Sequence, residues 1–216
     1  MNELLVLTIG QAPRPDIAAE LAAVLGERPT RVQGALDGLD DAEIDALVPV
    51  DAADTLHTRL PSGRDAVISK RAVTDRLGRL IELAGDRPTL VACTGRFDSL
   101  PARPNVLYPS VVLAGLVDAV LPADHRLGVL VPLADQVKPL GDGWKTARRP
   151  VTAVALRPGT DPEAAAITLR DDRVDLTVLD CFGYGTATLD EVRRITGRPV
   201  LSAVRCTAHL AAELLR

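Results

Sequence analysis

Two of the three cysteines stand in matching sequence frames. The segments TLVACTG and TVLDCFG, which end at Gly95 and Gly183, both read Thr, two apolar residues, a variable residue, Cys, a variable residue and Gly. Cys93 and Cys181 are therefore 181 − 93 = 88 positions apart. A thiol has a free pKa of about 8.5, which nearby dipoles and cations lower, so a cysteine can exchange protons with a substrate. Two facing thiols could remove a proton from one side of a carbon and deliver one to the other side.

The simpler reading of a cysteine is core packing, because cysteine is among the most buried residue types. That reading suits Cys206, which matches neither frame, whereas two cysteines in one repeated frame favour catalysis. Cys206 and His209 are too isolated to predict a metal site, so none is expected. His57 and His125 are expected to be solvated surface residues, and His209 to lie on a helix surface.

Short apolar runs alternate with amphipathic segments along the chain, which predicts parallel sheets flanked by helices. Strands are expected at 3–10, 31–36, 87–95, 105–110, 126–131, 151–159, 174–183 and 198–204, and helices at 15–25, 37–47, 71–85, 111–121, 161–174, 188–197 and 206–216. Residues 54–70 differ, because two extended runs flank the turn sequence PSG and predict a hairpin. The stretch 132–137, after the strand GVLV, is expected to be a polar loop.

The repeated cysteine frame predicts an α/β fold of two similar lobes, each a small parallel sheet flanked by helices, with the site in the cleft between them. We place the first lobe at 1–105 and the second at 106–205. Ligands of such sheets bind beyond the carboxyl ends of the strands, where Cys93 and Cys181 both fall.

Composition and the absence of known motifs exclude several classes of function. The 216 residues carry a net charge of −4 with no basic patch, which argues against nucleic acid, and no apolar stretch is long enough for a bilayer. The start of the chain reads as a strand rather than a signal peptide. An odd number of widely spaced cysteines fits a reducing cytoplasm. The chain lacks the GxGxxG and GK[ST] fingerprints, so neither nicotinamide nor ATP is expected.

The paired ACTG and DCFG motifs resemble the aspartate/glutamate (Asp/Glu/hydantoin) racemase superfamily. The segments LTIGQAPRPDI, SGRDAVISKR, LYPS, GVLVPL and LDCFGYG are similar to AroM family proteins over nearly the whole chain. The superfamily resemblance implies two lobes, one catalytic cysteine in each, no cofactor, and a C-terminal helix, here 206–216, that packs back on the first lobe. The sequence departs from the racemases after Cys181, where Phe-Gly-Tyr stands in place of the usual Thr and His.

The function expected from these observations is a cofactor-independent racemase, epimerase or isomerase of a small, amino-acid-like carboxylate. A single-cysteine decarboxylase or lyase and a non-catalytic ligand-binding protein remain alternatives. A second copy of the chain, in a homodimer, is an open choice of partner. The expected catalytic residues are Cys93 and Cys181, and the expected substrate-binding residues are Gly10, Gln11, Arg14, Thr94, Gly95, Arg96, Pro132, Phe182, Gly183 and Tyr184.

Overall fold

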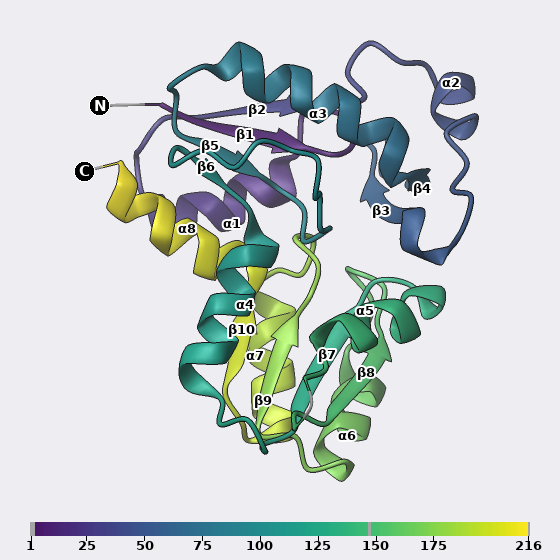
Figure 1. Cartoon of the computed structure of the whole chain (residues 1–216), viewed down its shortest axis with the longest axis vertical. Helices are drawn as coiled ribbons and strands as arrows, with labels where there is room; N and C mark the ends of the chain where they lie inside the picture. Colours follow the sequence, from purple (N-terminus) through teal and green to yellow (C-terminus); the bar gives the residue numbers. More distant parts are fainter. Residues whose placement is uncertain (1–2, 147, 216) are drawn as a thin grey trace.

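The computed structural model describes residues 3–146 and 148–215 and contains two separate four-stranded parallel sheets (Figure 1). The first sheet has the order β2-β1-β5-β6, and its strands are Leu4–Thr8 (β1), Thr30–Gly34 (β2), Thr89–Val91 (β5) and Val106–Leu107 (β6). The second sheet has the order β10-β9-β7-β8, and its strands are Leu127–Val131 (β7), Val151–Ala155 (β8), Leu176–Leu179 (β9) and Val200–Ser202 (β10). The expected fold of two α/β lobes is confirmed.

The two sheets repeat one topology. In each, the first strand in the chain is central, the second lies on one side of it, and the third and fourth follow on the other side. Cys93 follows β5 and Cys181 follows β9, which are the third strands of their sheets. The matching frames in the sequence therefore occupy equivalent places in the two lobes.

Helices connect and cover the strands. They are Pro15–Leu25 (α1), Asp41–Asp45 (α2), Lys70–Ala84 (α3), Pro109–Val120 (α4), Val137–Trp144 (α5), Glu163–Asp171 (α6), Thr186–Thr196 (α7) and Ala203–Leu214 (α8), with short 3-10 helices at Ala52–Asp54 (η1) and Ala134–Gln136 (η2). In α1, Ile17, Leu21 and Leu25 are buried at the spacing of one helical face. No helix within the described ranges is long and apolar enough to span a bilayer.

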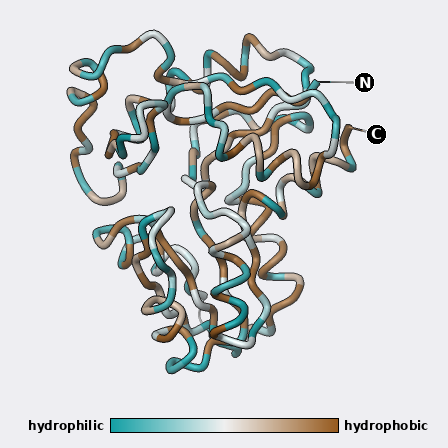
Figure 2. Tube along the Cα trace, turned by 180° about the vertical axis from the view of Figure 1, so that it is seen from behind, coloured by the Kyte–Doolittle hydropathy of each residue, from teal (hydrophilic) through white to brown (hydrophobic). Residues whose placement is uncertain are grey.

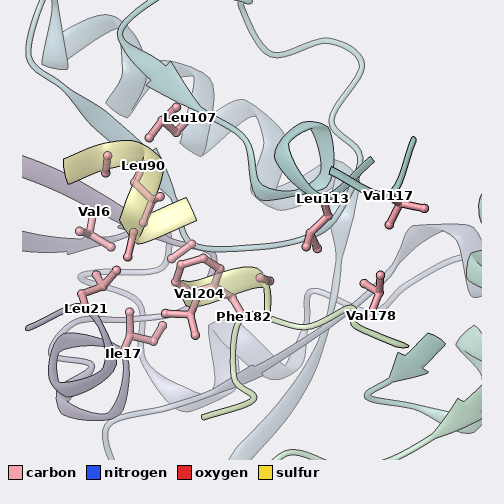
Figure 3. Close-up of a cluster of buried hydrophobic side chains, with 14 of the residues drawn as sticks. Val6, Ile17, Leu21, Leu90, Leu107, Leu113, Val117, Val178, Phe182 and Val204 are labelled. Carbon is pink, nitrogen blue, oxygen red and sulfur yellow. The ribbon is translucent and has the colours of Figure 1, made fainter. Parts of the chain in front are cut away.

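One hydrophobic cluster joins the two lobes. It contains Val6 and Leu90 of the first sheet, Val178 of the second sheet, and side chains of α1, α4 and α8 (Figure 3). Each lobe also has its own cluster on the other face of its sheet. Figure 2 colours the trace by hydropathy and shows brown apolar stretches in both lobes, interrupted by teal polar ones.

Helix α8 packs against α1, as the superfamily resemblance implies, and also against α4. It begins at Ala203, three residues before the expected start at Cys206. Strand β6 pairs with β5, so the chain leaves the first sheet after Leu107, slightly later than the boundary placed at residue 105.

The hairpin expected at 54–70 is present as strands Thr55–Arg59 (β3) and Asp65–Ser69 (β4). Gly63 in its turn has a φ of 85°, a conformation that favours glycine. In Figure 1 the hairpin extends from the first lobe on the side of the molecule where α5 of the second lobe lies.

The stretch 132–137, expected to be a loop, contains η2, and helix α5 begins at its last residue, Val137. Pro139 of α5 falls in the first helical turn, where a backbone N–H has no intrahelical partner to lose. Gly141 and Gly143 weaken the helical pattern in the sequence, because glycine is a poor helix former.

Candidate active site

The carboxyl ends of β1 and β5 in the first lobe and of β7 and β9 in the second face one cavity of about 300 Å³. The rest of the lining comes from the hairpin strand β3, the start of α1, η2, α5, the segment after β8 and the start of α7. Both Cys93 and Cys181 line this cavity, so the fold brings together the two thiols that the sequence analysis singled out.

Each of the two thiols accepts a hydrogen bond from the backbone of the glycine two residues further on. Cys93 Sγ accepts a hydrogen bond of 3.3 Å from the backbone N–H of Gly95, and Cys181 Sγ accepts one of 3.4 Å from that of Gly183. Both cysteines are free, Cys93 buried and Cys181 partly buried. The Cys-x-Gly frame thus positions one backbone donor on each sulfur, which would stabilise a thiolate.

Burial is the dominant influence on both thiols. It raises the pKa of Cys93 to about 12 and that of Cys181 to about 11, and the glycine amides offset this only in part. The charge of Asp180 raises the pKa of both thiols further. Both cysteines are therefore protonated near neutral pH in this structure.

Asp180 is a cavity residue that the sequence analysis missed. It is 5% exposed, and its Oδ2 accepts a hydrogen bond of 2.7 Å from Trp144 Nε1. Its backbone carbonyl accepts a hydrogen bond of 3.0 Å from Thr94 Oγ1, which links the strand ends of the two lobes. Burial raises the pKa of Asp180, against hydrogen bonds from Trp144 and Thr94 that lower it. The available signal was an acidic residue directly before Cys181 at the end of an apolar run.

The expectation that His57 is a solvated surface residue was wrong. Its side chain is only 5% exposed, not solvated, and it lines the cavity beside Thr58 and Arg59. Its Nε2 lies 3.4 Å from Asp65 Oδ1, and burial lowers the pKa of the imidazole. A lone hairpin normally exposes one face, but here that face is covered by the second lobe. The other two histidines, His125 and His209, are exposed as expected.

Two contacts fasten the hairpin to the second lobe. Gln136 Nε2 donates a hydrogen bond of 2.9 Å to the backbone carbonyl of Thr55, and Arg59 Nη2 donates one of 3.4 Å to that of Pro158. Gln136, Arg59 and Pro158 all line the cavity, so these contacts close it on the hairpin side.

The expected substrate-binding residues divide into two groups. The cavity lining includes Arg14, Thr94, Pro132, Phe182 and Gly183. Arg14 is largely committed, because its Nε and Nη2 donate to Asp16 at 2.9 and 2.6 Å, and its Nη1 lies 3.5 Å from Thr8 Oγ1.

The remaining expected residues lie outside the lining, which omits Gly10, Gln11, Gly95, Arg96 and Tyr184. Gln11 Nε2 donates to the carbonyl of Leu39, and Arg96 Nη2 donates to that of Gly143. Tyr184 is 1% exposed and donates its hydroxyl to the carbonyl of Leu156. Gly10 lies tightly against Thr58, and Gly95 holds the thiol of Cys93. No group of three His, Cys, Asp or Glu residues in the described part of the chain could hold a metal ion.

Comparison of the fold with solved structures finds several two-lobed enzymes of low sequence identity. Unliganded arylmalonate decarboxylase matches with a TM-score of 0.59 at 15% identity, covering 100% of this chain and 93% of that one. A glutamate racemase from Bacillus anthracis matches with a TM-score of 0.59 at 14% identity, covering 99% and 81%. A maleate isomerase from Pseudomonas putida with maleate matches with a TM-score of 0.60 at 14% identity, covering 99% and 92%. These likenesses show a shared fold.

Comparison by sequence gives a narrower result. A search of curated proteins returns no match. The family model described as AroM protein matches residues 4–215, which is almost the entire chain. The protein therefore belongs to the AroM family.

Proposed function

We propose that this protein is a cofactor-independent enzyme that moves protons at a carbon next to a carboxylate, as a racemase, epimerase or isomerase of a small amino-acid-like substrate. The observation that carries the proposal is the presence of two thiols at equivalent strand ends of two lobes, lining one cavity. A cavity of about 300 Å³ is at the small end of ligand sites. The three free cysteines fit a reducing cytoplasm.

In this mechanism one of the two protonated thiols first gives up its proton to water, and its thiolate then removes the proton of the substrate carbon. The electron pair of the C–H bond moves into the carboxylate to give an enediolate, and the thiol of the other cysteine then delivers its proton to the opposite face. One thiolate and one thiol remain, with their places exchanged, so charge and protons balance. The amide of Gly95 would stabilise the thiolate when it is on Cys93, and the amide of Gly183 would do so when it is on Cys181.

A single-cysteine decarboxylase is the second candidate, favoured by the protonated state of both thiols. Loss of carbon dioxide leaves the electron pair on the substrate carbon, and one S–H then supplies the proton. Such a reaction needs a thiol and no thiolate at the outset, which agrees with pKa values of about 12 and 11 for Cys93 and Cys181.

The test is a screen of amino acids, hydantoins and 2-substituted diacids in deuterated water, with mass spectrometry of the recovered substrate. We expect deuterium at one substrate carbon with the wild-type protein, and loss of net racemisation in both Cys93→Ser and Cys181→Ser. Cys206→Ser is the matched control, because Cys206 lies on α8 outside the cavity lining, and it should keep its turnover. Loss at one position alone would favour the decarboxylase, and loss at neither would leave a binding protein.

A further inference from the structure

Asp180 adds a buried carboxyl to the cavity that holds the two thiols. Its carboxyl is held at the end of β9 by Trp144 Nε1, and Trp144 itself is 6% exposed. The backbone places Asp180 next to Cys181 in the chain, and the Thr94 hydroxyl ties it to the residue that follows Cys93. The carboxyl therefore has one fixed location relative to both sulfurs.

No ion pair among the described residues includes Asp180. The two arginines of the cavity are already paired, Arg14 with Asp16 and Arg59 with Asp65. The cation that acts on Asp180 is Arg96, whose guanidinium is bonded to the carbonyl of Gly143. The other carboxylate of the cavity lining, Asp16, has Arg14 as its partner, so Asp180 is the one without an ion pair among the described residues. It shares the cavity with the buried Cys93 and the partly buried Cys181.

A buried cavity of this kind resists a second negative charge, because each charge loses its hydration and repels the other. A carboxyl ionises at lower pH than a thiol, so the first charge goes to Asp180. We propose that Asp180 is a positioning residue of this site, whose carboxylate carries the one negative charge of the cavity lining that is not paired with an arginine and so keeps both Cys93 and Cys181 as S–H donors. This inference rests on the proposed function, because it concerns the same two thiols, and it favours the decarboxylase, the second candidate, which starts from a thiol and needs no thiolate.

Other charged and titratable groups also face these thiols, and the experiment must separate them from Asp180. From the surrounding elements they are Lys70, Arg14, Asp16, His57, Arg59, Arg96 and Tyr184. None of these groups is altered by an Asp180→Asn substitution. Asparagine keeps an oxygen for the indole N–H of Trp144 but cannot carry the charge.

The experiment measures alkylation of each cysteine by iodoacetamide between pH 7 and 10, with peptide mass spectrometry to resolve the three sites. Iodoacetamide reacts with the thiolate, so its rate reports the thiolate fraction at each pH. Removing a like charge within the cavity should raise the alkylation rates of Cys93 and Cys181 at a given pH by about tenfold or more. The rate of Cys206, which serves as an internal reference, should change by less than about twofold, well below that effect.

Asp175→Asn is the matched control, because Asp175 lies just before β9, at the end of the strand away from Cys181, and bonds the backbone N–H of Arg126. It should leave all three alkylation profiles unchanged. Equal profiles in Asp180→Asn and wild type would overturn the proposal, whatever the substrate screen shows, because no substrate is used.

A second measurement needs no variant. Trp144 is the only tryptophan and bonds Asp180 directly, so its fluorescence reports the ionisation of that carboxyl. We expect a fluorescence transition in the wild-type protein at a pH below that at which Cys93 and Cys181 begin to react. A transition above the thiol range, or none, would contradict the assignment even if Asp180→Asn failed to fold.

Discussion

The backbone at Gly95 approaches its neighbours more closely than the backbone at Gly183. A Cβ at Gly95 would lie 3.1 Å from Leu56 Cδ2 and 3.3 Å from Cys93 Sγ, whereas one at Gly183 would meet Pro158 at an ordinary 3.4 Å. We expect Gly95→Ala to lower the free energy of unfolding by about 1–2 kcal/mol and Gly183→Ala by less. Chemical denaturation of the two variants checks this, and equal losses would show that Leu56 adapts freely.

The buried thiols also predict a pH dependence of stability. Folding raises the pKa of Cys93 from 9.0 to about 12, so the unfolded chain releases this proton first as the pH rises. The folded state keeps its proton, and stability is therefore lost between about pH 9 and pH 12. Over that range the free energy of unfolding should fall more steeply in wild type than in Cys93→Ser, by up to about 1.4 kcal/mol per pH unit. Lysines and tyrosines titrate in both proteins, so parallel curves would contradict the assigned burial.

Site residues that belong to a repeated sequence pattern can be predicted, whereas site residues outside such a pattern are missed. Cys93 and Cys181 are recognisable because their frames match, and the equivalent strands β5 and β9 explain that match. Asp180 and His57 have no counterpart in a repeated pattern. Their importance depends on what the second lobe covers, which local spacing does not encode.

Among the elements, α7 begins against a side chain of the other lobe. Glu20 on α1 accepts hydrogen bonds from the backbone N–H of Thr186 at 2.9 Å and from its hydroxyl at 2.7 Å. A carboxylate at this end also suits the helix dipole. We expect Glu20→Ala to lower the free energy of unfolding by about 1–2 kcal/mol, as loss of a helix cap does, and Glu20→Gln by less because one acceptor remains.

Thermal and denaturant unfolding of these two variants test the contact. Glu191→Ala is a suitable control, since its ion pair with Arg194 lies on the exposed face of α7 and should contribute little. If Glu20→Ala and Glu191→Ala behaved alike, the interlobe cap would have no energetic role.

Strong periodicity made most elements predictable, including α1 and α3 with their buried apolar faces. Helix α5 was not predicted because Pro139, Gly141 and Gly143 have low helix propensity. The proline nevertheless falls in the first turn, where a helix tolerates it. Strand β6 was assigned to the second lobe because two residues, Val106 and Leu107, carry no signal of their pairing partner.

For the whole molecule, the hairpin is one of the parts of the first lobe that contact the second, and it does so at the edge of the cavity. Asp65 is central to it, lying 3.3 Å from Arg59 Nε and 3.8 Å from Nη1 of Arg157 in the second lobe. Asp65→Asn should leave the thermal midpoint nearly unchanged, because partly exposed ion pairs contribute about 0–1 kcal/mol. It should, however, increase hydrogen exchange in β3 and β4 and speed alkylation of Cys181.

Asp171→Asn is the control for this prediction, since Asp171 pairs with Arg170 at the exposed end of α6 in the second lobe. A hairpin that exchanges no faster in Asp65→Asn than in Asp171→Asn would mean that Gln136 and Arg59 hold it without the ion pairs.

The chain passes between the lobes twice, after Leu107 into α4 and after Ser202 into α8, and both passages lie on the side of the shared hydrophobic cluster (Figure 1). The two connections define a line, which is the axis of a rigid-body rotation of one lobe relative to the other. Rotation about that line moves the hairpin edge most and the hinge edge least. A rotation of the second lobe about that line would open the cavity at β3 and leave the cluster around Val6, Leu90 and Val178 packed.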